Sequence, residues 1–251
     1  MNMEIGIGIL DLYDQDNLNE CLNSIKNIPQ ENIIVASLTK NSSILENHRT
    51  YTTQTPLATL RNHIISQFRI KNLKYFFIIH SNQTIKNENL WNDTIKLAET
   101  FGTWFLTGFE NKALTIEDDS NLELNVSSKL NSDFLFLASG IVKNNGYFDE
   151  RFFNGKELDV LDYIIRLRTK NLTTPHSFFA TIPQDWMRIT IVKNKAIGYL
   201  DFPESDKSVQ LSYGYFMHTH KYVPTQNDPA SVSSDELFKN IETLQKNYAK
   251  K

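Results

Sequence analysis

The sequence predicts an α/β fold built on a mainly parallel sheet, and its N-terminal part carries the clearest signal. Residues 5–10 and 33–36 are uninterrupted apolar runs, which is the pattern of strands that are buried on both faces. Residues 17–27, which separate them, have an apolar stripe at helical spacing, made of Leu18, Cys21, Leu22 and Ile25. A strand, a helix and a second strand in this order predict a parallel βαβ unit.

The rest of the chain continues the alternation of helices and strands. Further helices are expected at residues 57–70, 87–101 and 158–168, and further strands at residues 75–79, 103–107 and 133–138. Residues 41–56 are rich in Thr, Ser and Asn and are expected to form a loop, whereas residues 178–200 contain short strand-like runs. These segments predict one domain over residues 1–222, followed by a linker and a C-terminal helix over residues 223–251.

Composition limits the class of protein. The chain has 251 residues, 40% of them hydrophobic, and a net charge of −3, so it suits one α/β domain and has no global basic field that would recruit nucleic acid. The single cysteine, Cys21, is expected to be a buried core thiol. We recognise no signal peptide before the first strand and no apolar run that could cross a bilayer, and we therefore expect a cytoplasmic protein.

Polar residues follow the first two predicted strands. Asp11 and Tyr13 come after the first strand, and Ser37 comes after the second. Open parallel sheets bind their ligands beyond the carboxyl ends of the strands, so these three residues are candidates for ligand contacts.

The helix expected at residues 158–168 has two distinct faces. Its apolar side is made of Leu158, Leu161 and Ile165, and its charged side is made of Asp159, Asp162 and Arg166. Such a charged side either lines a polar cleft or is a solvated surface with a local Asp–Arg pair.

The segment just before this helix resembles a known family. Residues 146–153, GYFDERFF, followed by acids and Arg166, resemble the acceptor-side signature of family-2-like glycosyltransferases. Arg61-Asn62-His63 is similar to another element of that family, and the resemblance covers residues 4–170. It implies a GT-A type fold (a Rossmann-like nucleotide-diphospho-sugar transferase), in which a mixed, mainly parallel sheet is flanked by helices. It also implies sugar transfer from a nucleotide-sugar donor to an acceptor hydroxyl, with inversion.

The resemblance places the catalytic base of the family in the acidic motif before Arg166. Counting back from Arg166 puts the first acid of the motif at Asp159, its second acid at Val160 and its later Asp at Asp162. A slip of the alignment would bring in Glu157 instead. The catalytic candidates are therefore Asp159 first, then Glu157 and Asp162. We expect Asp159→Ala to abolish turnover and to leave stability nearly intact.

On the donor side, the resemblance implies contacts from Arg61 and Asn62, in addition to the residues at the strand ends. Ser37-Leu38 stands where the family has an acid that helps to hold the nucleotide base. His80-Ser81-Asn82 stands where metal-dependent members have Asp-x-Asp, whose carboxylates bind Mn²⁺ or Mg²⁺. Three interpretations stay open. A metal binds through His80 and a later histidine, basic groups hold the diphosphate without a metal, or donor chemistry is lost.

A second histidine-containing stretch lies near residue 220. His218-Thr219-His220 in an extended chain would place both imidazoles on one side, and Lys221 would be free to neutralise phosphate. The metal candidates are therefore His80, Asn82, His218 and His220, and Lys221 is a candidate donor contact. The alternative is two surface histidines in a loop.

Three functions fit these observations. The first is an inverting glycosyltransferase, the second is a catalytically inactive glycosyltransferase-like binding or structural module, and the third is a nucleotidyltransferase on a related scaffold. The sequence does not specify the acceptor, which would be a glycan, a lipid, a protein or a modified base. The expected C-terminal helix has an apolar stripe that either docks on the domain or pairs with a second copy in a homo-oligomer, made of Leu237, Ile241, Leu244 and Tyr248.

Overall fold

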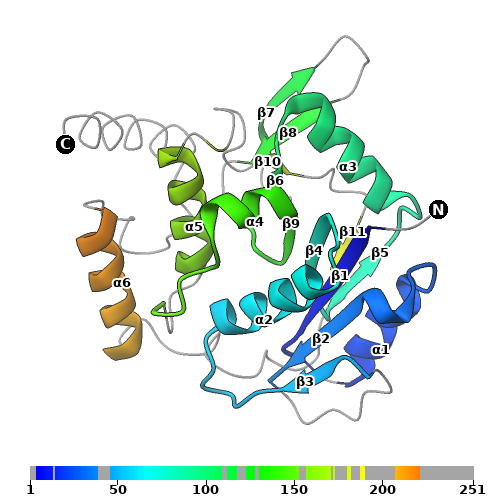
Figure 1. Ribbon diagram of the computed structural model, residues 1–251, viewed down its shortest axis with the longest axis horizontal. Coiled ribbons are helices and arrows are strands. Elements are labelled where there is room, and N and C mark those ends of the chain that lie inside the picture. Colours follow the sequence, from blue (N-terminus) through cyan, green and yellow to red (C-terminus); the bar gives the residue numbers. More distant parts are fainter. Residues whose placement is uncertain are drawn as a thin grey trace.

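The computed structural model describes residues 4–13, 15–38, 46–108, 112–117, 123–127, 130–152, 157–170, 172, 180–181, 187–189 and 207–220. The strands are β1 (Ile5–Asp11), β2 (Ile33–Ser37), β3 (His48–Thr50), β4 (Tyr75–His80), β5 (Gln83–Ile85), β6 (Phe105–Thr107), β7 (Lys112–Glu117), β8 (Glu123–Ser127), β9 (Phe134–Ala138), β10 (Ala180–Thr181) and β11 (Met187–Ile189). The helices are α1 (Gln15–Ser24), the short 3₁₀ helix η1 (Gln30–Asn32), α2 (Leu57–Ile70), α3 (Leu90–Phe101), α4 (Ser139–Asn145), α5 (Leu158–Thr169) and α6 (Lys207–His220) (Figure 1).

Nine of these strands form one mixed, mainly parallel sheet in the order β3-β2-β1-β4-β9-β6-β10-β8-β7. Strands β3, β2, β1 and β4 are parallel to one another. Strand β9 is antiparallel to both β4 and β6, and β8 is antiparallel to β10 and β7. The predicted class of fold is therefore confirmed. Strands β5 and β11 form a separate two-stranded ribbon.

Strand β1 shows how the sequence allows helices on both faces of the sheet. Its isoleucines pack on one face with residues of α1 and α3, including the buried Cys21. Its glycines face α2 on the other side, where a Cβ added at Gly6 would lie 2.5 Å from the ring of Phe68. A side chain at this position would push the helix away, so the glycine permits the close approach of α2 to the sheet.

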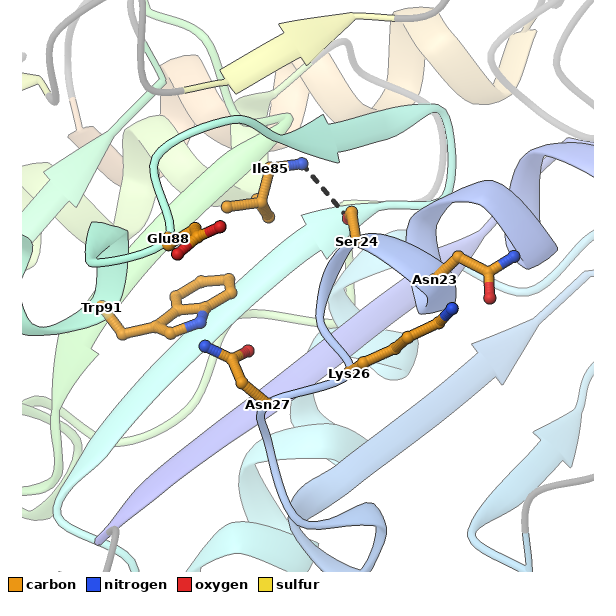
Figure 2. Close-up of a pocket in the computed structure, with 7 residues that line it drawn as sticks. All are labelled: Asn23, Ser24, Lys26, Asn27, Ile85, Glu88 and Trp91. Atoms are coloured by element: carbon orange, nitrogen blue, oxygen red, sulfur yellow. Dashed lines mark hydrogen bonds between the residues drawn. The ribbon is translucent and has the colours of Figure 1, made fainter.

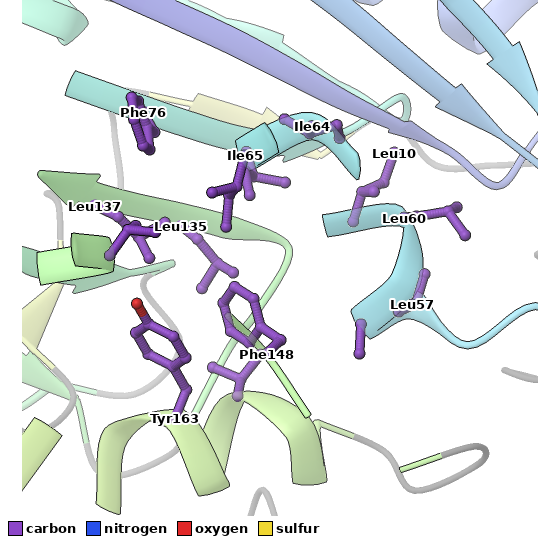
Figure 3. Packing of buried hydrophobic residues seen from close by; sticks show 14 of the residues in the cluster. Leu10, Leu57, Leu60, Ile64, Ile65, Phe76, Leu135, Leu137, Phe148 and Tyr163 are labelled. Carbon is purple, nitrogen blue, oxygen red and sulfur yellow. The ribbon is translucent and has the colours of Figure 1, made fainter. Parts of the chain in front are cut away.

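Helices α2, α4 and α5 build the second core on the α2 side of the sheet. Figure 3 shows Phe148 and Tyr163 facing Leu135 and Leu137 of β9. The rings of Phe148 and Tyr163 stack at 4.4 Å between centroids, an arrangement that adds to their area burial. The GYFDERFF segment is thereby anchored in the core.

The strand order creates a topological switch point between β1 and β4. From β1 the chain passes through α1 to β2 on one side, and from β3 it returns through α2 to β4 on the other side of β1. Connections in opposite directions leave a crevice beyond the carboxyl ends of these two strands, which is where open α/β sheets bind ligands. Tyr13 and His80 lie at this edge.

Some sequence-based expectations were wrong. The expected loop at residues 41–56 contains β3, and the extended chain expected around His218 and His220 is helix α6. Helix α4 was not predicted. The strand-like runs of residues 178–200 are described only at β10 and β11, and residues 223–251 lie outside the described residues. Within the described part of the chain, no helix is long and apolar enough to span a bilayer.

We predict that Gly6→Ala lowers the free energy of unfolding by about 1–3 kcal/mol, because the new methyl group overpacks the contact between β1 and Phe68. Urea unfolding measures the loss. The control is Gly140→Ala in α4, where nothing lies within 4 Å of the added Cβ. The control should be neutral or slightly stabilising, and equal losses in both variants would contradict this account of the packing.

Candidate active site

The carboxyl edge of the sheet begins with a buried polar pair. Ser37 donates a 2.6 Å hydrogen bond to Asp11 Oδ2, and both residues are fully buried. The pair joins the ends of β1 and β2, which are in register at these two residues. Asp11 therefore supplies an acid at this edge. The family resemblance places the expected acid at the position of Ser37 instead. Tyr13 follows nearby, and burial, with a smaller effect of Asp133, raises the pKa of its hydroxyl to about 12.

The centre of the site is an ion pair between α2 and α5. Arg61 is fully buried and pairs with Asp159, whose side chain is 6% exposed. The second amino group of Arg61 donates a 3.1 Å hydrogen bond to Ser132, and its guanidinium lies 5.7 Å from the centre of the Phe148 ring. A buried guanidinium requires such partners because an unpaired charge in a protein interior is strongly unfavourable.

Glu157 stands at the N-terminus of α5 in an unusual conformation. Its φ of 60° places the backbone in the left-handed region, which costs energy for a residue other than glycine. Glu157 Oε1 accepts a 2.6 Å hydrogen bond from the Ser132 amide. Glu157 Oε2 is buried and has no hydrogen-bond partner among the described residues.

The surroundings of Glu157 change its acidity. Burial raises the pKa of its carboxyl to about 8; the Ser132 hydrogen bonds and the charge of Arg61 lower it, and the charge of Asp133 raises it further. The side chain is therefore mostly protonated at neutral pH, and it becomes a carboxylate in mildly alkaline solution.

His80 and Asp133 meet at the same edge. His80 Nδ1 lies 3.3 Å from Asp133 Oδ1, and the His80 amide donates to the Asp133 carbonyl. Burial lowers the pKa of His80, against the opposing effect of Asp133, and Arg61 lowers it further. The imidazole is thus held neutral. We call Arg61, His80, Ser132, Asp133, Glu157 and Asp159 the edge cluster.

Sequence reasoning missed Asp133 as a site residue. It directly precedes β9, and β9 is antiparallel to β4, so its first residues lie where β4 ends. The feature of the sequence that could have identified Asp133 is its place at the start of an apolar run. The direction of the strand decides which edge of the sheet receives this acid, and a local pattern does not contain that information.

The tripeptide His80-Ser81-Asn82, which the sequence resemblance places at the position of Asp-x-Asp, is buried. His80, Ser81 and Asn82 are at most 6% exposed. Each has a buried polar side-chain atom without a hydrogen-bond partner in the described part of the chain: His80 Nε2, Ser81 Oγ and Asn82 Oδ1. Buried polar groups without partners cost free energy and are uncommon. Three in a row at a switch point are suited to contact a polar ligand.

The Asn62 side chain makes its hydrogen bonds within the protein. Its amide donates to the Phe148 carbonyl and to Glu150, and its carbonyl oxygen accepts from the Phe148 amide, at 2.8–2.9 Å. These bonds join α2 to the GYFDERFF segment. The side chain therefore positions the GYFDERFF segment next to α2.

Asp162 braces α5 from its other side. Its oxygens accept from Arg166 Nε and pair with His220 Nε2, both at 2.8 Å. Arg166 also donates to the carbonyls of Asn145 and Tyr147. The two carboxylates on the charged face of α5 are therefore buried and paired, and Arg166, whose side chain is 25% exposed, is paired with one of them.

His218 and His220 do not lie on one side of an extended chain, as the sequence analysis expects. Because α6 is helical, residues two apart point in different directions, and His220 is buried against Asp162 whereas His218 is exposed. Within the ranges that the structure describes, no group of three or more His, Cys, Asp or Glu residues could hold a metal ion. Lys221 lies outside the described residues.

Comparisons with known proteins support the fold. No family model matches the chain, and no curated protein matches it by sequence. The crystal structure of S. aureus TarS 1–349 in complex with UDP-GlcNAc is similar, with a TM-score of 0.57 and 12% identity, over 98% of this chain and 73% of that one. GalNAc-T7 with UDP, GalNAc and Mn²⁺ has a TM-score of 0.53 and 9% identity, over 96% and 55% of the two chains. The chain therefore has the GT-A fold of nucleotide-sugar glycosyltransferases.

The raised pKa of Glu157 predicts a specific pH dependence of stability. Between the ordinary value of 4.5 and about 8, the folded state binds more protons than the unfolded state, so this contribution to stability falls as pH rises through that window. Glu157→Gln retains an acceptor for the Ser132 amide and should be more stable than the parent protein near pH 9. Urea unfolding at several pH values checks this, with the exposed Glu31→Gln as control. A parent-like pH dependence in Glu157→Gln would contradict it.

Asp159→Ala should not give the activity-only effect that the sequence suggests. Removal of Asp159 leaves Arg61 buried without its carboxylate, a change that typically costs about 3–5 kcal/mol. The double variant Arg61→Met/Asp159→Leu should regain most of this loss. Lys74→Ala, which breaks the exposed Lys74–Glu4 pair, should cost less than about 1 kcal/mol. The measurement is the free energy of unfolding of each variant. If Asp159→Ala loses no more stability than Lys74→Ala, the stabilising role of the Arg61–Asp159 pair is refuted.

Proposed function

We propose that the chain is an inverting glycosyltransferase that moves a sugar from a nucleotide-sugar donor to an acceptor hydroxyl, and that Glu157 is its catalytic base. The fold supports this proposal, because TarS was solved with UDP-GlcNAc and GalNAc-T7 with UDP and GalNAc. The observation that carries it is the Glu157 carboxyl, which combines an unpartnered buried oxygen with a pKa of about 8.

In this mechanism Glu157 Oε2 takes the proton of the acceptor hydroxyl. The acceptor oxygen then forms a bond to the anomeric carbon as the bond to the nucleoside diphosphate breaks on the opposite face. A general base works best when its pKa is near the working pH, and the surroundings of Glu157 bring its carboxyl into that range. The strained backbone of Glu157 fits a group that is held in place for chemistry.

The contacts of the other two acids suggest different duties for them. Asp159, the first candidate by sequence, has the buried Arg61 as its partner, and we propose that it positions Arg61 and the first turn of α5. Asp162 is held by Arg166 and His220, and we propose that it braces the same helix. Glu157 is then the acid of the three with an oxygen left for substrate.

The donor is proposed to lie over the switch point between β1 and β4. Asp11, Tyr13 and Ser37 would contact the nucleoside, and the unpartnered atoms of His80, Ser81 and Asn82 would contact the diphosphate. The described residues do not fit a metal site made by the protein alone, and the mechanism routes no step through a metal. The carboxylate of Asp133 lies beside His80, with Oδ1 at 3.3 Å from the His80 Nδ1 atom.

One observation favours the alternative of a catalytically inactive binding module. His80 and Asn82 replace both acids of Asp-x-Asp, and Val160 replaces the second acid of the later motif. Donor binding distinguishes the two functions. An inactive structural module would bind no nucleotide sugar, whereas a transferase must bind one.

The proposal is tested by calorimetric titration of UDP, GDP and their common sugar conjugates, with and without Mn²⁺, followed by turnover of the donor that binds. We expect donor binding, and a kcat/KM that rises with pH and levels off above pH 8, since Glu157 must lose its proton. Glu157→Gln should lose about 10²–10⁴-fold in rate and lose the pH dependence.

The exposed Glu31→Gln is the matched control and should behave as the parent protein does. Full activity of Glu157→Gln would remove Glu157 as the base. The absence of binding to every donor would favour the inactive module.

A further inference from the structure

A pocket on the α1 and α3 side of the sheet is separate from the edge cluster. Its volume is about 300 Å³, and it is lined by Asn23, Ser24, Lys26, Asn27, Ile85, Glu88 and Trp91. These residues come from the end of α1, the turn after it, the end of β5 and the start of α3 (Figure 2). Neither the proposed donor contacts nor the proposed base lie in it.

The walls of this pocket are held together by hydrogen bonds. Ser24 Oγ donates to the Cys21 carbonyl at 2.7 Å and accepts from the Ile85 amide at 3.2 Å, as the dashed line in Figure 2 shows for the second bond. Trp91 is buried and packs edge-on against Phe77, with 4.9 Å between ring centroids. The pocket is therefore formed before any ligand arrives, which lowers the entropic cost of binding.

The polar side chains around the pocket are available to a ligand. Asn23, Lys26, Asn27 and Glu88 are exposed, and none of the four has a side-chain hydrogen bond or an ion pair within the described part of the chain. They offer two amides, each both donor and acceptor, one cation and one anion. Below them the pocket is lined by Ile85, which is half-buried, and by Trp91, which is 3% exposed.

We propose that this pocket binds a neutral sugar ring. Lys26 and Glu88 cancel in charge, which disfavours a strongly charged ligand such as a phosphate. A sugar has an apolar C–H face and a rim of hydroxyls, and this pocket pairs the side chain of Ile85 and the small exposed part of the Trp91 indole with a rim of amides and charges. Its volume is at the lower end of the range for small-molecule sites, about 300–1,000 Å³, and suits one or two rings.

The position of the pocket gives the site a role beyond the transfer reaction. Ile85 follows Asn82 by three residues, so their Cα atoms are at most about 11 Å apart. A glycan held here would keep its carrier close to the carboxyl edge of the sheet. Binding at the pocket does not depend on the chemistry proposed for Glu157.

The test is a calorimetric and saturation-transfer NMR titration of the full chain with cellobiose, lactose and chitobiose. We expect one of them to bind with a Kd of about 1 mM. Asn27→Ala/Glu88→Ala should weaken binding at least about tenfold. Trp91→Phe, which keeps an aromatic ring against Phe77 and removes the N–H, should also weaken it.

The control is Lys86→Ala, since Lys86 is exposed, adjoins Ile85 and does not line the pocket. It should bind the disaccharide as the parent protein does, and UDP binding measured on every variant reports the donor site separately. No disaccharide binding up to about 10 mM, or binding that the Asn27→Ala/Glu88→Ala change leaves intact, would overturn the proposal. Disaccharide binding by the parent protein, together with no binding of UDP, GDP or their sugar conjugates to it, would count against the proposed function alone.

Discussion

The buried ion pair between Arg61 and Asp159 is the contact on which the rest of the site depends. Arg61 is the largest fully buried side chain among those described, and a guanidinium in that position is tolerated only with an opposite charge and further acceptors. The pair joins residues 98 positions apart and locks α2 to the first turn of α5. Glu157 immediately precedes that turn, so its position beside Ser132 follows from the same contact.

Helix α5 is held from three directions, and this explains why a helix so rich in charge is buried. Asp159 ties it to α2, Asp162 ties it through His220 to α6, and Arg166 ties it to the carbonyls at the end of α4. Tyr215 adds a contact with Asp149 on the GYFDERFF segment. Although burial by itself would raise the pKa of Asp149, hydrogen bonds from Arg151 and Tyr215 hold it below its usual value.

Prediction succeeded where an element is encoded by its own apolar pattern. Helix α2 and strands β1, β2 and β4 were predicted almost to the residue, because continuous or periodic burial is visible locally. Strand β3 was not predicted because it is short and mostly exposed and depends on pairing with β2. Helix α6 failed because its aromatic and polar residues lack a clear helical stripe, and packing of Phe216 and His220 against the domain overrides that weak local preference.

By itself, therefore, the sequence determined the α/β class, the order of the main elements and the acids worth considering, since all of these follow from short-range patterns of polarity. Only the tertiary structure decided what each acid is for. It brought Arg61 to Asp159, enclosed Glu157, and turned β9 so that Asp133 meets His80. The physical reason is that burial and charge pairing depend on neighbours distant in the chain, and these set the pKa and the available atoms of each side chain.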